Sequence, residues 1–141
     1  MSAEENKAIV REWIEAVWSN HDLDRVEDFY APNYTLNGEP QSIPRIKENL
    51  ASVFSAFPDL RTTIDDMIAE GDTVAYRFTW RGTHQGELKE TPFGPISATG
   101  KPFTLNAITY VRLANGKIAE DWGQFDSLKF FQLLGVVPTP A

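Results

Sequence analysis

The sequence predicts a single α+β domain, and three observations lead to this fold class. Apolar residues recur at helical spacing through the first half of the chain, whereas apolar and polar residues alternate at strand spacing through the second half. An Asn-Gly pair separates the last two strand-like segments, as in tight hairpins. Helices followed by a mostly antiparallel sheet define the α+β class. With 141 residues and no repeat or linker, we expect one domain over residues 1–141.

The first half is expected to hold three helices. The first extends from about residue 3 to residue 19, because its apolar residues share one helical face. Asp22 is the expected N-cap of a second, short helix, which the stretch APNY ends. Ser42 caps a third helix, which ends before Pro58 because the residue preceding a proline avoids helical backbone angles.

The second half is expected to form strands. Residues 61–71 have a weak strand pattern and residues 73–82 a strong one, and a Gly/Pro-rich connection follows. Segments 104–113 and 117–125 then flank Asn115-Gly116, a pair that accepts the positive φ angles of a type I′ hairpin turn. A short C-terminal helix completes the domain, with Asp126 as its N-cap and Gly135 behind it.

The strand IAEDWGQF, residues 118–125, carries two adjacent carboxylates, Glu120 and Asp121. Because strand side chains alternate between faces, strict alternation places one of the two carboxylates on the core face. Asp121 lies between Ala119 and Gly123 on its face, and these small side chains leave room for a ligand in front of the acid. In the alternative, the opposite face is the core and Asp121 is solvated. Alternation alone fits both.

Composition excludes several classes of partner. The net charge is −7 and no run of Lys or Arg exists, so nucleic acid and anionic membranes are poor candidates. The absence of cysteine excludes disulfides, thiolate nucleophiles and iron–sulfur sites. The acidic N-terminal stretch does not resemble a signal peptide, and we expect a cytoplasmic protein. Aromatic residues make up 12% of the chain, enough to supply both a core and an apolar pocket.

Motifs for cofactors are missing. The stretch that ends in GKP departs from the phosphate loop, because its spacing is one residue too long and Pro102 replaces the hydroxyl residue. His21 and His84 are the only histidines and form no metal-ligand pattern, so we expect neither a metal nor another cofactor. His84, at the end of the strongest strand, is either a structural histidine or a hydrogen-bond donor at a pocket mouth.

Six stretches carry a resemblance to a known family. VEDFYAPNY, FSAFPDL, AEGDTVAYRFTWRGTHQG, ATGKPF, VRLANGKIAEDW and QLLG occur in the same order as in the SnoaL-like polyketide cyclase and ester cyclase family, within the nuclear-transport-factor-two-like superfamily. The resemblance covers nearly the whole chain. It implies a strongly curved, mostly antiparallel sheet that packs on the N-terminal helices as a cone, encloses an apolar cavity and ends in a short C-terminal helix. The outward sheet face is implied to build a homodimer or larger homo-oligomer. Candidate cavity-lining residues are Trp13, Val17, Tyr34, Phe54, Phe57, Tyr76, Phe78, Trp80, Thr109, Gly123 and Phe125.

The chain departs from this family at chemically important positions. Many relatives have Glu-His-Trp where this chain has Glu120-Asp121-Trp122. The acid/base Asp of the characterised cyclases corresponds to Gly123, and a histidine on their preceding strand corresponds to Thr109. Ala98 replaces the usual Pro. Either Asp121 has taken over the proton chemistry, or the protein does something else.

These observations lead to a first functional hypothesis, a cofactor-independent enzyme that acts on a small apolar carbonyl compound. Asp121 is the expected base, since a carboxylate with a pKa raised by desolvation can remove a proton α to a carbonyl, and His84 is the candidate donor to the enolate. Cyclisation, isomerisation or dehydration would result. The substrate and the reaction type are not specified by the sequence.

Two further hypotheses belong to other classes. The same fold could be a non-catalytic module that binds a small hydrophobic ligand or mediates oligomerisation. It could also hydrolyse an epoxide with water activated between two carboxylates and an arginine, for which Arg77, Arg81 and Arg112 are available. An arginine beside Asp121 would favour the last hypothesis, and a wholly apolar cavity would favour the binding module.

Overall fold

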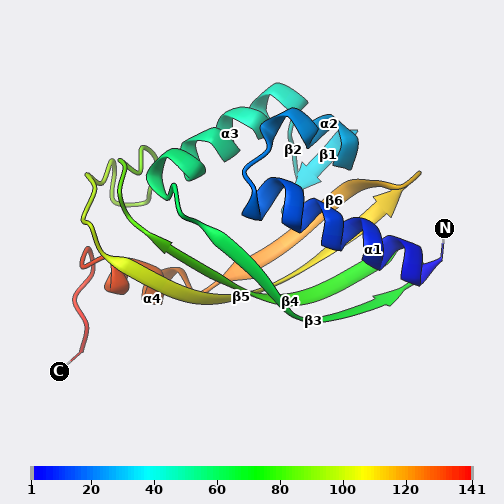
Figure 1. Cartoon of the computed structure of the whole chain (residues 1–141). Coiled ribbons are helices and arrows are strands. Elements are labelled where there is room, and N and C mark those ends of the chain that lie inside the picture. The colour runs from blue at the N-terminus through cyan, green and yellow to red at the C-terminus, as the bar shows by residue number, and fades with distance from the viewer. Residues whose placement is uncertain (1, 141) are drawn as a thin grey trace.

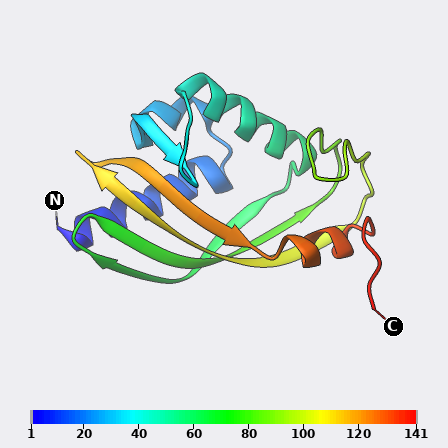
Figure 2. The ribbon, with the colours of Figure 1, turned by 180° about the vertical axis from the view of Figure 1, so that it is seen from behind.

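The computed structural model describes residues 2–140. Helices α1, α2 and α3 lie along one side of a curved sheet (Figure 1). The view from behind shows α4 beyond the end of β6, near the C-terminus (Figure 2). Among residues 2–140, no helix is long and apolar enough to cross a membrane. In chain order the elements are α1 (Ala3–Trp13), η1 (Ile14–Ser19), η2 (Leu23–Arg25), α2 (Val26–Phe29), β1 (Tyr30–Leu36), β2 (Glu39–Pro40), α3 (Ile43–Ala56), β3 (Arg61–Glu70), β4 (Thr73–Thr83), β5 (Pro102–Ala114), β6 (Lys117–Phe125) and α4 (Ser127–Leu133).

The helices begin where their capping residues predict. Ser42 Oγ accepts a hydrogen bond of 3.2 Å from the Arg45 amide at the start of α3. Asp126 Oδ1 accepts one of 2.9 Å from the Lys129 amide at the start of α4, and Asp22 caps η2 in the same way. Each cap satisfies an amide that has no partner inside its helix, so these boundaries follow from local sequence.

The sheet has the strand order β2-β1-β6-β5-β4-β3. It is mixed, since β1 runs parallel to β6 whereas the other neighbours are antiparallel. APNY follows the end of α2, as predicted, but these residues also lie within β1, a strand that was not predicted. The register between β1 and β6 shifts between Tyr30 and Thr35, and Pro32 lies in this irregular stretch. A proline is tolerated where a strand does not pair regularly, so its presence concealed the strand.

The predicted hairpin is confirmed. Asn115 and Gly116 have φ angles of 52° and 75°, and the flanking strands β5 and β6 pair antiparallel. Along β5 every second residue is buried, from Phe103 to Leu113, which identifies the inner face of the sheet. This face packs toward the helices, and its residues contribute to the apolar core together with those of the helices.

A bulge in β6 decides which carboxylate points inward. Leu113 lies opposite Ile118, but the next pair joins Arg112 to Glu120, so β6 contains one extra residue, Ala119. Strict alternation along residues 118–125 was therefore wrong. Ile118 and Asp121 both face inward across the bulge, because they pair with the buried residues of β5, whereas Glu120 pairs with the outward-facing Arg112.

Candidate active site

An apolar cavity of about 310 Å³ lies between the inner sheet face and the helices. Its walls come from α1, η1, β1, α3 and the four long strands. Asp121 is the one ionisable acid or base in its lining apart from tyrosines, and no Lys, Arg or His lines it among the described residues. Of the candidate lining residues, eight contribute to the wall: Trp13, Tyr34, Tyr76, Phe78, Trp80, Thr109, Gly123 and Phe125.

Three candidates lie in the core instead. Val17 is fully buried, and its place at the cavity is taken by Trp18. The reason is that η1 is a π-helix, which has a wider turn than an α-helix. The residue five positions after Trp13, which is Trp18, therefore faces the cavity, rather than Val17 at four positions. Phe54 stacks on the ring of His21 with a centroid separation of 3.9 Å. Phe57 packs against aromatic rings near α4, with centroid separations of 5.1 and 5.9 Å.

Sequence reasoning missed several lining residues because their elements were not predicted or because helical spacing does not specify a cavity wall. The contribution of β1 and the following turn could not be expected without that strand. The signal that was available is the aromatic and amide content of the stretch from Tyr30 to Gln41. The missed residues are Ile14, Trp18, Tyr30, Leu36, Asn37, Gln41, Ile46, Asn49, Leu50, Val53, Thr62, Ala107, Ile108 and Gln124.

Asp121 lies at one end of the cavity and is held by two hydroxyl groups. Tyr34 Oη donates a hydrogen bond of 3.0 Å to Asp121 Oδ2, and Thr109 Oγ1 lies 2.9 Å from Oδ1. Burial raises the pKa of the Asp121 carboxyl, and the hydrogen bonds from Thr109 and Tyr34 oppose that rise without cancelling it. No cation compensates the carboxylate in the cavity lining, so its proton is held more tightly than in water.

The Thr109 hydroxyl can serve both charge states of Asp121. Its Oγ1 is 2.7 Å from the Trp122 carbonyl oxygen as well as 2.9 Å from Asp121 Oδ1. A hydroxyl has one proton, so it donates to only one of these oxygens at a time. When Asp121 is ionised, Thr109 can donate to the carboxylate. When Asp121 is protonated, the acid can donate to Thr109, which then donates to the carbonyl.

Gly123 makes room for this arrangement. It lies directly opposite Thr109, and a Cβ at this position would sit 3.0 Å from Thr109 Oγ1. The Gly123 amide donates a 3.0 Å hydrogen bond to Asn37 Oδ1, and the Asn37 amide donates one of 2.8 Å to the Asp121 carbonyl oxygen. The junction between β1 and β6 therefore holds the backbone on both sides of the acid.

Three tyrosines surround the acid end and remain protonated. Burial raises the pKa of Tyr30, Tyr34 and Tyr76, and the negative charge of Asp121 raises each of them further. Tyr30 and Tyr34 meet edge to face with a centroid separation of 4.9 Å. The acid end is thus a carboxyl group among phenol groups that act as hydrogen-bond donors rather than as bases.

The structure does not bring His84 to Asp121. His84 is fully buried, is absent from the cavity lining and packs against Phe57. The Thr99 amide donates a 3.2 Å hydrogen bond to His84 Nδ1, so this nitrogen is an acceptor and the ring is neutral. Burial also lowers the pKa of the imidazole. Of the two interpretations of His84, the geometry supports the structural one and not the donor at the pocket.

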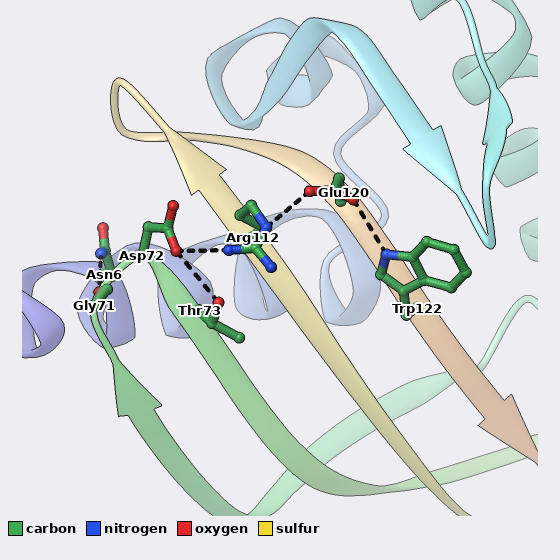
Figure 3. Close-up of polar contacts among 7 residues, drawn as sticks. All are labelled: Asn6, Gly71, Asp72, Thr73, Arg112, Glu120 and Trp122. Carbon is green, nitrogen blue, oxygen red and sulfur yellow. Dashed lines mark hydrogen bonds and ion pairs between the residues drawn. The ribbon is translucent and has the colours of Figure 1, made fainter.

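Glu120 lies on the outer face in a network of charges (Figure 3). Arg112 Nε donates to Glu120 Oε2 at 2.8 Å, and Arg112 Nη1 contacts Asp72 Oδ1 at 2.9 Å. Trp122 Nε1 donates to Glu120 Oε1 at 3.4 Å. Arg112 is thus committed to the outer face. The hypothesis of arginine-assisted epoxide hydrolysis lacks its arginine in the described cavity lining.

A curved sheet that closes with helices around an apolar cavity, with one acid at its end, is a fold of the nuclear-transport-factor-two-like type. The family model described as SnoaL-like polyketide cyclase matches residues 8–134, and the chain belongs to this family.

Solved structures with the same fold agree with this assignment. AclR from Streptomyces galilaeus, a proposed hydroxylase, is 27% identical with a TM-score of 0.80, and the match covers 97% of this chain and 100% of AclR. IdmH from Streptomyces antibioticus, a proposed polyketide cyclase, is 25% identical with a TM-score of 0.76, covering 93% and 99%. TsrD from Streptomyces laurentii is 22% identical with a TM-score of 0.84, covering 97% and 99%. No protein among the curated sequences matches the chain.

Proposed function

We propose that this protein is a cofactor-independent acid–base enzyme, which transfers protons on an apolar carbonyl compound bound in the cavity. The observation that supports the proposal is the position of Asp121. A carboxyl group with a raised pKa lies at the end of an apolar cavity, within hydrogen-bond distance of Tyr34 and Thr109. This combination is typical of catalytic acids and bases, and a purely apolar binding site has no need of it.

The proposed reaction begins with ionised Asp121. A carboxylate oxygen removes a proton from the carbon next to the substrate carbonyl, and the electron pair of the broken C–H bond moves to form an enolate. Tyr34 takes the donor role that was expected of His84. Its phenol group donates to the Asp121 carboxylate before the transfer, and it can donate to the developing oxyanion instead as Asp121 takes up the proton. Thr109 keeps Asp121 in place in both charge states.

The second half of the reaction decides the product. The enolate carbon can attack a second carbonyl of the same molecule and form a ring, with the proton on Asp121 delivered to the new alkoxide. It can also receive that proton at another carbon, which is an isomerisation, or expel a neighbouring hydroxyl group that leaves as water with the proton. Cyclisation is the reaction that the family and IdmH favour.

Exchange of α-hydrogens in D₂O tests the proton-transfer step without knowledge of the natural substrate. The probe is a biphenyl with a para-acetyl group, whose methyl protons are followed by NMR. The wild-type protein should accelerate the exchange, and Asp121→Asn should reduce the acceleration by at least about 100-fold. Glu120→Gln is the matched control, since it neutralises the adjacent carboxylate on the outer face. Binding of the probe without acceleration would contradict the proposal and favour a non-catalytic binding module.

Cellular location and assembly are proposed from the sequence. We place the protein in the cytoplasm as a homodimer or larger homo-oligomer that pairs through the outer sheet face. Ile68, Tyr110 and Trp122 are exposed large hydrophobic residues on strands of this sheet, with Ile68 at 68% exposure. Sedimentation at micromolar concentration should show at least a dimer, and Ile68→Glu should shift it toward monomer. A monomer in both cases would exclude this assembly.

A further inference from the structure

Unsatisfied polar atoms are concentrated at the cavity. Within residues 2–140, six buried side-chain nitrogen or oxygen atoms have no hydrogen-bond partner, and four belong to residues that line the cavity: Trp13 Nε1, Gln41 Oε1, Thr62 Oγ1 and Trp80 Nε1. A buried polar atom without a partner is uncommon in native proteins, because its desolvation costs about 1–3 kcal/mol. Their gathering around one cavity leaves hydrogen-bonding capacity there that a bound molecule can use.

Thr62 and Trp80 form a pair. They lie directly opposite each other in the register of β3 and β4, on the inner face that also carries Phe78. Residues opposite each other in an antiparallel pair have Cβ atoms roughly 4.5–5.5 Å apart, so the two side chains leave the sheet next to each other and both line the cavity. Thr62 is 92% buried, with an exposed fraction of 8%. Ser19 Oγ interacts with the main chain of Thr62 and leaves the Thr62 hydroxyl unpaired.

This pair lies at the opposite end of the cavity from the acid. Asp121 is level with Val111 on β5, and Val111 is level with Val74 on β4. Trp80 is six residues further along β4, which corresponds to roughly 20 Å of strand at 3.3 Å per residue. Between the two ends the inner face carries aromatic rings, so the cavity has a polar group at each end and an apolar middle.

The surroundings of Trp80 offer no strong acceptor. Its ring is packed among Trp18, Phe78 and Phe125, with centroid separations of 5.8, 5.0 and 5.8 Å. Aromatic faces accept hydrogen bonds only weakly. The donors of Thr62 and Trp80 are neutral, and the described lining contains no cation. A neutral acceptor such as a carbonyl or ether oxygen therefore suits this end better than a carboxylate or phosphate.

We propose that Thr62 and Trp80 form a second binding site for a neutral oxygen acceptor at the far end of an elongated, flat substrate. This inference rests on the proposed function, since it places the reacting carbonyl of the same molecule at Asp121. The substrate class that follows is an apolar, planar molecule with one oxygen function at each end. The aromatic residues along the middle of the cavity pack against its flat part, and the two ends fix its orientation.

Two matched probes test the second site by calorimetric binding. Both are biphenyls with a para-acetyl group on one ring; the other ring carries a para-methoxy group in the first probe and a para-ethyl group of nearly the same shape in the second. The wild-type protein should bind the methoxy probe about fivefold more tightly, as expected for roughly 1 kcal/mol from a gained hydrogen bond. Thr62→Val should reduce the preference to within about twofold, and Trp80→Phe should reduce it likewise.

The controls separate this inference from the proposed function. Thr63→Val changes the neighbouring hydroxyl, which is exposed on the other face of β3, and should keep the full preference. The preference is a ratio of two equilibrium affinities measured without turnover, so it tests the second site whether or not proton exchange occurs at Asp121. Thr62→Val should keep or raise the thermal midpoint of the empty protein, since it removes an unpaired buried hydroxyl. Equal affinities in the wild type, or an undiminished preference in Thr62→Val, would overturn the second site even if exchange at Asp121 is confirmed.

Discussion

The two faces of β6 carry the same chemical group in opposite environments. Asp121 faces the cavity, without a cation in the described lining, and burial raises its pKa. Glu120, the preceding residue, lies on the outer face beside the guanidinium of Arg112. An exposed ion pair of this kind contributes little to stability, because solvent screens it. The comparison teaches that desolvation, rather than the presence of a carboxylate, makes Asp121 the chemically useful one, and that the bulge at Ala119 decides which of the two carboxylates is desolvated.

Insertion of one alanine after Ala119 should break the comparison most strongly. β6 already holds one extra residue at this point, so a second one would bring Glu120 opposite Val111 and Asp121 opposite Tyr110, and the two carboxylates would exchange faces. The cavity would lose Asp121. We expect loss of the proton exchange and a lower free energy of unfolding by several kcal/mol, measured by urea denaturation. Deletion of Ala119 is the control, because regular pairing then keeps Glu120 opposite Arg112 and Asp121 opposite Val111, and exchange should be retained.

The hairpin turn that joins β5 to β6 sets the register for both carboxylates. Gly116 has a φ of 75°, which a β-branched residue resists. Gly116→Val should therefore lower the free energy of unfolding by more than about 1 kcal/mol, as measured by thermal or urea denaturation. Asn115→Gly, at the other turn position, accepts the positive φ without strain and is the control. An unchanged midpoint for Gly116→Val would contradict the assigned turn.

Gly123→Ala should disturb the inner carboxylate and leave the outer one unchanged. The new Cβ would sit 3.0 Å from Thr109 Oγ1 and displace the hydroxyl from Asp121. Since the hydrogen bond from Thr109 lowers the pKa of Asp121, its loss should raise that pKa further, which carboxyl-carbon NMR titration measures. Exchange at neutral pH should fall by about tenfold as a result. Thr109→Val should shift the pKa in the same direction if the hydroxyl is the cause.

Asp121→Asn should change how stability depends on pH. The folded-state pKa of Asp121 is raised, so the folded protein holds this proton more tightly than the unfolded chain. The free energy of unfolding therefore falls as Asp121 ionises. This fall begins near the pKa of the unfolded chain, about 3.9, and ends once the pH has passed the pKa of the folded state. The variant should match or exceed the wild type at pH 7 and lose that advantage in acid.

His84 does not disturb this measurement. Its pKa is lowered, so it reduces stability as pH falls below the unfolded value of about 6.5, but it does so equally in both proteins and cancels in their difference. If the difference in unfolding free energy between Asp121→Asn and the wild type stayed constant from acid to neutral pH, Asp121 would not be desolvated.

Glu120→Gln should have the smallest effect. It removes an exposed ion pair with Arg112 and one contact with Trp122, so the free energy of unfolding should change by less than about 1 kcal/mol at low salt and by less still at high salt. The rate of α-hydrogen exchange should stay within about twofold of the wild type. A large loss of exchange here would mean that the two faces are not chemically independent.

Local signals in the sequence determined most of the fold. Ser42 and Asp126 begin helices because their side chains satisfy nearby amides, and Asn115-Gly116 forms a tight turn because both residues accept positive φ. The caps and the turn depend on neighbours a few residues away, so the sequence carries them directly. The family resemblance and the small residues around Asp121 made it the candidate acid, but alternation alone fitted either face.

Tertiary structure decided the rest. Ala119 is extra only in relation to β5, and Trp18 replaces Val17 at the cavity only because η1 is wound as a π-helix against the sheet. β1 exists because it pairs with β6, almost 90 residues later in the chain, despite its proline. His84 is buried beside Phe57 rather than at the cavity. Each of these outcomes depends on contacts between distant segments. A pattern within one segment can identify its apolar face, but it does not specify which residues of other segments pack against that face.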